Sequence, residues 1–455
     1  MMPTRLSAMA RVTGGTIHGQ DVEVTGVATD SRDVEPGDLF VALVGDRSDG
    51  QAFAPKAVAR GAVAVLGRRP EPAVPSVVVD DPARALLDLG REARRTLPGT
   101  VVGVTGSVGK TSVKDLTAAV LASRFRVVAS RRSFNTEVGV PLTLLAAGPE
   151  TDVVVCEMGS RGPGHISLLC DVARPTIGIV TGVGPAHLEM FGSLEAVAQA
   201  KAELPEALPV DGTAVLNVDD PVVRGFAGRT AAAVTGYGLS PEADVRAEDV
   251  RLDELGSGRF TLVAAAGREP VELGVPGEHM VSNALAAAAV GLALGLSPAE
   301  CAAALKDAEV SPWRMEISET MDGLRILNDA YNANPMSMAA ALKAAVWIRG
   351  DGRCVAVLGE MAELGQSADR EHERVGELAV RLGVDHMVVV GAGAARIAAG
   401  AEREGAEREH VVVVGSVNEA VEAVRAWARP GDVVLLKASR RASLERMAVA
   451  LGAGG

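Results

Sequence analysis

The residues best suited to chemistry stand in the segment 105-TGSVGKTS-112. Gly106 and Gly109 permit a tight loop in which several backbone N–H groups face one point. Lys110 adds a mobile cation there, and Thr111 adds a hydroxyl suited to a magnesium ion. These groups match a nucleoside triphosphate, although valine occupies the position at which the usual phosphate-binding loop has its first glycine. The alternative is a plain strand-to-helix turn, but such a turn has no need for the Lys-Thr-Ser run, so we favour nucleotide binding.

The elements on either side of this loop are predicted by the apolar pattern. Residues 101–104 are apolar without interruption, as expected of a strand buried on both faces. After Thr111, apolar residues recur at Val113, Leu116 and Val120, which is the period of a helix. The loop therefore joins a buried strand to the start of a helix, where the helix dipole also favours an anion.

Two further candidates follow predicted strands, at the edge of the sheet where ligands bind. Glu157 ends the strand in 152-DVVVCEMGS-160, and His187 lies just beyond the strand that starts at residue 176. A carboxylate beside a phosphate-binding loop usually serves a magnesium ion. Alone, a glutamate could cap a helix and a histidine could be structural. Together with the loop, they favour a metal site.

Composition limits the class of protein. The 455 residues are 48% hydrophobic and 3% aromatic with 51 glycines, which favours an α/β protein of about three domains. A net charge of -13 argues against binding nucleic acid or an anionic membrane. Four scattered cysteines, without a metal-binding pattern, indicate reduced thiols. Without a signal sequence or a membrane-length apolar run, we expect a cytoplasmic protein.

The chain divides into three predicted domains. Residues 1–84 form short strands and turns, residues 85–310 contain the phosphate-binding loop, and residues 311–455 alternate strands with helices in a second doubly wound sheet. Within 391-GAGAAR-396 a GxG pair follows a strand, but arginine replaces the third glycine, so we reject dinucleotide binding. Asn283 stands near a predicted helix start, where it could reach a ligand, although spacing alone favours a helix cap.

The chemistry these residues indicate is phosphoryl transfer. The sequence lacks a nucleophile elbow, a kinase catalytic loop and a cysteine in an electropositive setting. The substrate itself would therefore attack the γ-phosphate of ATP, and a carboxylate substrate would give an acyl phosphate that an amine can displace. The residues alone leave ligase, kinase and ATPase open.

An ordered series of segments resembles the Mur ligase family of peptidoglycan synthesis. The series includes TGSVGKTS, SFNTEVGVPLTLL, EMGS, GVGPAHLEMFGS, GEHMVSNALAAAA, WRME and ILNDAYNANPMS, and it runs through almost the whole chain. The resemblance implies three α/β domains: a small UDP-sugar-binding domain, a central P-loop domain with a parallel sheet, and a C-terminal Rossmann-like domain. It also implies an ATP- and Mg²⁺-dependent amide ligase that acts on small molecules, and we expect a monomer.

The resemblance also implies catalytic and metal-binding roles. Lys110 would contact the β- and γ-phosphates, Thr111 and Glu157 would hold a first magnesium ion, and His187 would help to hold a second. Lys201 matches a lysine that many family members carry as a carbamate, which would make it a carboxylate-like metal ligand. Without the family, Lys201 would be only an exposed helical lysine.

The remaining expected site residues contact nucleotide or substrate. The nucleotide would contact the loop residues Thr105, Gly106, Ser107, Gly109, Lys110, Thr111 and Ser112, together with Asn135, Asn283, Arg314 and Asp329. Arg314 and Asp329 would close over the phosphates and ribose from the last domain. Ser31 and Arg32 would receive the UDP-sugar, and Asn332 is a further substrate-binding candidate.

Within the family, DAYNANPMS and LGEMAELGQSADREH resemble the member that adds D-alanyl-D-alanine to a UDP-muramyl-tripeptide. A third-residue-adding ligase, a folylpolyglutamate-type enzyme and a nucleotide switch without ligase activity are the alternatives. The first domain argues against the folate enzyme. Three features depart from the usual pattern: Thr136, the Ser107-Val108 pair and 437-KASRRAS-443. The sequence does not indicate whether the tripeptide carries diaminopimelate or lysine.

Overall fold

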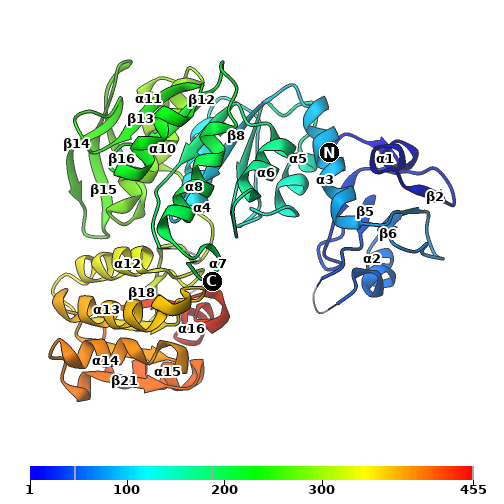
Figure 1. Cartoon of the computed structure of the whole chain (residues 1–455). Coiled ribbons are helices and arrows are strands. Elements are labelled where there is room, and N and C mark those ends of the chain that lie inside the picture. The colour runs from blue at the N-terminus through cyan, green and yellow to red at the C-terminus, as the bar shows by residue number, and fades with distance from the viewer. Residues whose placement is uncertain (46–47, 186–187, 453–455) are drawn as a thin grey trace.

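The computed structural model describes residues 1–45, 48–185 and 188–452. The chain forms three α/β units, and the first and last units lie on different sides of the middle one (Figure 1). Each unit has its own sheet and its own buried apolar cluster. The predicted three-unit α/β architecture is confirmed.

The first unit is built on a small mixed sheet. Its five-stranded sheet has the order β2-β7-β6-β5-β4, in which only the β2–β7 pair is antiparallel, and β1 and β3 form a separate two-stranded ribbon. The strands are β1 (Thr4–Arg5), β2 (Thr16–His18), β3 (Glu23–Val24), β4 (Gly26–Ala28), β5 (Asp38–Val41), β6 (Ala64–Gly67) and β7 (Ser76–Val78), and the helices are α1 (Leu6–Thr13) and α2 (Ala54–Ala59).

Helix α3 (Pro82–Thr96) joins the first unit to the middle one. Asp81 caps it by accepting hydrogen bonds from the N–H groups of Ala83 and Arg84, and proline at its first position suits a helix start. Its apolar residues contribute to both neighbouring cores. Leu86 packs in the core of the first unit, and Leu87 packs against the core of the middle unit. The predicted boundaries after residues 84 and 310 stay predictions.

The middle unit carries the phosphate-binding loop on a nine-stranded sheet of order β16-β15-β14-β13-β12-β11-β8-β10-β9. Strands β8 to β14 pair in parallel, and β14, β15 and β16 form an antiparallel extension. The strands are β8 (Thr100–Thr105), β9 (Val127–Ala129), β10 (Val153–Glu157), β11 (Ile177–Val180), β12 (Thr213–Asn217), β13 (Ala233–Gly238), β14 (Val245–Leu252), β15 (Ser257–Ala264) and β16 (Gly267–Pro276). The helices are α4 (Lys110–Ala122), α5 (Gly139–Ala146), α6 (His165–Ala173), α7 (Leu188–Phe191), α8 (Leu194–Glu206), α9 (Pro221–Arg224), α10 (His279–Ala293) and α11 (Pro298–Lys306).

The last unit is the predicted second doubly wound sheet. Its six strands have the order β17-β18-β22-β19-β20-β21, and only the edge pair β17–β18 is antiparallel. The strands are β17 (Glu316–Glu319), β18 (Arg325–Asn328), β19 (Cys354–Gly359), β20 (His386–Val390), β21 (Val411–Val414) and β22 (Val433–Lys437). The helices are α12 (Pro335–Ile348), α13 (Ala368–Arg381), α14 (Arg396–Arg403), α15 (Val417–Trp427) and α16 (Glu445–Ala450).

The helix that follows the phosphate-binding loop is held by a second, alanine-rich helix. Helix α10 packs along α4, and its run from Ala284 to Ala289 is buried. Small side chains let the two helix backbones approach closely, so the loop at the start of α4 has a rigid support. The same packing places the first turn of α10 beside that loop.

The structure also bears on two expectations drawn from composition. All four cysteine thiols are free and buried, as expected for reduced cysteines. Among the described residues, no helix has both the length and the apolar character needed to cross a membrane.

Helices α13 and α14 pack closely together at Gly376, and this contact yields a stability prediction. A Cβ atom at Gly376 would lie 1.9 Å from the carbonyl oxygen of Ile397. We expect Gly376→Ala to lower the free energy of unfolding of the last unit by about 1–3 kcal/mol, because the helices must separate. Chemical denaturation measures the change. Gly415→Ala is the matched control, because its Cβ would meet only the Glu419 carboxylate at 3.7 Å; equal stabilities of the two variants would contradict the prediction.

Candidate functional site

The phosphate-binding loop has the geometry that its sequence predicts. Strand β8 is buried, and Gly109 adopts a left-handed conformation (φ 80°) directly before α4, a conformation that a side chain would strain. The ammonium group of Lys110 donates hydrogen bonds to the carbonyl oxygens of Gly106 (2.7 Å) and Ser107 (3.4 Å). Burial lowers the pKa of Lys110, and the nearby Glu157 carboxylate partly offsets that effect.

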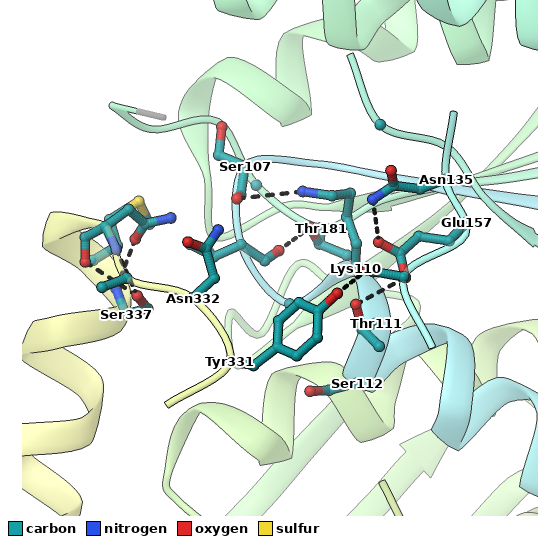
Figure 2. Close-up of a pocket in the computed structure, with 18 of the residues that line it drawn as sticks. Ser107, Lys110, Thr111, Ser112, Asn135, Glu157, Thr181, Tyr331, Asn332 and Ser337 are labelled. Atoms are coloured by element: carbon teal, nitrogen blue, oxygen red, sulfur yellow. Dashed lines mark hydrogen bonds between the residues drawn. The ribbon is translucent and has the colours of Figure 1, made fainter. Parts of the chain in front are cut away.

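The carboxylate of Glu157 lies buried against this loop (Figure 2). The Thr111 hydroxyl donates to one of its oxygens at 2.8 Å, and the Asn135 amide donates to the other at 2.8 Å. A buried carboxylate is costly unless each oxygen is hydrogen-bonded or bound to a cation. Three segments that are distant in the sequence therefore meet at one carboxylate.

Lys201 is also buried, contrary to the exposed position that its helical context alone would give. Helix α8 brings its ammonium group to the Ser160 hydroxyl, to which it donates at 2.7 Å. Burial moves the pKa of Lys201 well below its ordinary value, and the charge of Lys110 acts in the same direction. The side chain therefore has an amine that is neutral more readily than an exposed lysine.

A cavity of about 1040 Å³ separates the middle unit from the last unit. Lys110, Glu157 and Lys201 line its middle-unit side, and Arg314, Asp329 and Asn332 line the opposite side. In Figure 2, Tyr331 and Asn332 come from the last unit and face the start of α4. The structure thus brings together residues that lie about two hundred positions apart in the chain.

Arg314 is fixed by an unusual backbone on both sides. Trp313 and Met315 have positive φ angles of 61° and 55°, which cost on the order of 1 kcal/mol each for residues with a side chain. The guanidinium carbon of Arg314 stands 4.2 Å from the ring centroid of Tyr331, and the Tyr331 hydroxyl is hydrogen-bonded to that of Ser133. The Nε atom of Arg314 is buried without a hydrogen-bond partner among the described residues.

Sequence reasoning missed several residues of this cavity. Lys437 ends strand β22 and is buried, and its ammonium group stands 2.9 Å from an Asp329 oxygen. Tyr331 supports Arg314, and Ser160 pairs with Lys201. Lys437 follows an uninterrupted apolar strand as Glu157 does, so the strand-end argument could have found it. Tyr331 and Ser160 had no signal beyond their neighbours in sequence.

Most of the predicted site residues line the cavity, but some do not. Those that line the cavity are Ser107, Gly109, Lys110, Thr111, Ser112, Asn135, Glu157, Lys201, Asn283, Arg314, Asp329 and Asn332. Thr105 lies behind the loop, where its hydroxyl donates to the carbonyl oxygen of Met158 at 2.8 Å, and Gly106 presents its carbonyl oxygen to Lys110. His187 lies outside the described residues.

The structure decides between the two readings of Asn283. Helix α10 begins at His279 and its N-cap position is Glu278, so the helix-cap reading of Asn283 is wrong. Asn283 is the fifth residue of the helix and is buried, and its amide approaches the sulfur of Met280 at 3.2 Å. The helix starts earlier than the spacing suggested, and this turns Asn283 toward the phosphate-binding loop, where it lines the cavity.

A second cavity, of about 600 Å³, lies between the first and middle units. Arg32 lines it, whereas Ser31 is buried and is not part of its lining. Hydrogen bonds from Arg32 lower the pKa of the Asp30 carboxyl to about 2, and the shortest of them joins the two side chains at 2.6 Å. Arg132 and Ser133 line the other side, so this cavity adjoins the segment that carries Asn135.

The fold and the site define an α/β nucleotide-dependent enzyme whose cavity is completed by a separate C-terminal unit. Three family models match this chain: the Mur ligase family catalytic domain over residues 23–89, the Mur ligase middle domain over 104–291, and the Mur ligase glutamate ligase domain over 313–440. The chain belongs to the Mur ligase family.

Individual relatives agree over the full length. A UDP-N-acetylmuramoyl-tripeptide–D-alanyl-D-alanine ligase of Mycobacterium bovis is 45% identical, over 99% of this chain and 98% of the relative. The crystal structure of MurF from Acinetobacter baumannii matches with a TM-score of 0.87 and 29% identity over 99% of both chains. MurF ligase from Thermotoga maritima in complex with ADP matches with a TM-score of 0.80 and 29% identity, over 94% of this chain and 97% of that one.

The ion pair between Lys437 and Asp329 yields a prediction about stability. We expect Asp329→Asn to destabilise the last unit by about 3–5 kcal/mol, because the substitution leaves the buried Lys437 ammonium without its counter-charge. Denaturant titration measures this change. The double variant Asp329→Asn/Lys437→Met serves as the control, since it removes both charges and should recover most of the lost stability. A single variant as stable as the parent would contradict the prediction.

Proposed function

We propose that this protein uses ATP to join D-alanyl-D-alanine to UDP-N-acetylmuramoyl-tripeptide. The observation that carries the proposal is the single cavity in which the phosphate-binding loop and Glu157 face Arg314 and Asp329 of the last unit. The relatives that match this chain over its whole length carry the name of that activity. We extend the proposal to a cytoplasmic monomer of three domains, with boundaries after residues 84 and 310.

The reaction has two balanced steps. The carboxylate of the UDP-linked tripeptide attacks the γ-phosphorus of ATP, so that an acyl phosphate forms and ADP leaves. The amine of the dipeptide then attacks the acyl carbon: a C–N bond forms, the C–O bond to phosphate breaks, phosphate leaves, and the ammonium proton passes to solvent. Neither step needs a nucleophile from the protein. The protein must position three substrates and stabilise the transferring charge.

The cations of the cavity would stabilise the negative charge of the phosphoryl group during its transfer. Lys110 would contact the β- and γ-phosphates of a nucleotide bound to the loop. Arg314 lines the same cavity from the last unit. Because both are partly buried, their charges act with less screening than in water. The Asn283 and Asp329 side chains would contact the rest of the nucleotide, and Arg32 in the second cavity would receive the UDP end of the substrate.

The oxygen donors near the loop fit a magnesium ion. Thr111 and Glu157 offer a hydroxyl and a carboxylate that already converge within hydrogen-bonding distance, and hard oxygen ligands suit this ion. Lys201, as a carbamate, would add a second anionic donor, and its lowered pKa favours the neutral amine that carbamylation requires. His187 is proposed as a further ligand. When bound, the ion neutralises phosphate charge.

The product assay tests the reaction. With ATP, magnesium, UDP-muramyl-tripeptide and D-alanyl-D-alanine, we expect the pentapeptide product with one ADP and one phosphate for each bond. Both tripeptides, with diaminopimelate and with lysine, are to be tried. We expect Lys110→Ala or removal of magnesium with a chelator to abolish product. Turnover only with the dipeptide precursor and a free diamino acid would indicate a third-residue ligase instead.

The same assay separates a ligase from a nucleotide switch. A switch would bind nucleotide through Lys110 but would give no product, and it would be indifferent to Arg314 and Lys201. Arg314 faces the phosphate-binding loop from another unit, which favours the ligase.

Lys201→Ala tests the carbamate. We expect ligase activity to fall by about 100-fold or more, because even the residues that only hydrogen-bond to metal ligands commonly contribute 10–100-fold. Short carboxylates such as acetate should restore part of the activity by taking the place of the carbamate. Lys306→Ala, an exposed lysine of the same unit, is the control and should keep full activity. Unchanged activity in Lys201→Ala would exclude a role for this side chain.

A further inference from the structure

The segment 437-KASRRAS-443 departs from the usual family pattern and forms part of the cavity wall. It follows β22 and continues as a short 3-10 turn over Arg440–Ala442. The Ser439 hydroxyl accepts a hydrogen bond from the Ala362 N–H at 2.9 Å, and the Ser439 N–H donates to the carbonyl oxygen of Glu360 at 2.9 Å. The turn is therefore fixed to the loop that follows β19.

The cations of this segment differ in what they contact. Lys437 pairs with Asp329. Arg440 pairs with Glu445 at 2.6 Å and stacks on the Trp313 ring, 4.3 Å from its centroid. Arg441 lines the cavity and is exposed, and its side chain makes no hydrogen bond or ion pair with any residue that the structure describes.

Small and apolar groups lie on the same wall. Met336 and Ala340 come from helix α12, and Ala362 comes from the loop that holds Ser439. A ligand here would meet a guanidinium group together with apolar contacts of limited size. D-alanyl-D-alanine offers a terminal carboxylate and two methyl groups, which match these contacts in kind.

We propose that Arg441 receives the terminal carboxylate of the acceptor dipeptide and makes the site selective for an acceptor with a free carboxylate. Guanidinium and carboxylate groups pair through two parallel hydrogen bonds, which fix orientation as well as position. A dipeptide spans about 7 Å. A carboxylate held at Arg441 would leave the amine, at the opposite end of the dipeptide, free to attack the acyl group in the same cavity. This inference rests on the proposed function.

The other last-unit cations that line the cavity already have contacts within the protein. Arg314 stacks on Tyr331 and is the residue proposed to meet the phosphates, and Lys437 is buried against Asp329. Arg440 is held by Glu445. Arg441 is thus the cation of this wall that can pair with an incoming carboxylate without breaking an existing contact.

The test compares D-alanyl-D-alanine with its C-terminal amide as acceptors. We expect the parent enzyme to prefer the free acid. In Arg441→Ala, KM for the free acid should rise about tenfold, the loss of about 1.4 kcal/mol of binding. KM for the amide, ATP and UDP-muramyl-tripeptide should stay unchanged, so the preference disappears. Arg441→Lys should retain part of it.

The control is Arg446→Ala, an exposed arginine five residues further on that does not line the cavity. It should behave as the parent does. A general structural effect would change KM for both acceptors alike, whereas loss of carboxylate recognition changes the ratio of the two. An Arg441→Ala enzyme that still prefers the free acid overturns this inference and leaves the proposed function intact. A parent enzyme that joins neither acceptor to the tripeptide overturns both.

Discussion

The buried carboxylate of Glu157 is the interaction on which the rest of the site depends. A carboxylate at that depth is stable only when both oxygens are paired, and Thr111 and Asn135 each satisfy one of them. The pairing joins the end of β10 to the start of α4 and to the segment after β9. Because Lys110 is adjacent to Thr111, the same contacts also set the position of the cation that we propose to meet the phosphates.

The opposite wall of the cavity belongs to a unit with a separate core, and hydrogen bonds between the two units hold that wall across from the loop. The Ser311 N–H donates to the Asp115 carboxylate at 2.8 Å where the chain enters the last unit. The Trp347 indole N–H donates to the carbonyl oxygen of Asp253 at 2.8 Å at the far side of the interface. Two units with separate cores suit an enzyme that must admit three substrates and then exclude water.

Three lysines that line the cavity give it its electrostatic character. Lys110, Lys201 and Lys437 all have lowered pKa values because burial disfavours their charged forms. Their environments differ, since Lys437 faces Asp329 directly while Lys201 has the Ser160 hydroxyl as its neighbour. A bound polyphosphate would offset the unfavourable burial of the Lys110 charge, so nucleotide binding and the stability of the site are linked.

The sequence by itself determined the three-unit α/β fold and the phosphate-binding loop, because apolar periodicity and a local Gly-Lys-Thr run depend only on neighbouring residues. It also indicated Glu157, because residues at the ends of parallel strands share one edge of a sheet. Only the tertiary structure decided that Lys201 is buried, that Asn283 faces the loop rather than capping a helix, and that Lys437 supports Asp329. Burial and pairing depend on which distant segments pack together, and no local pattern records that.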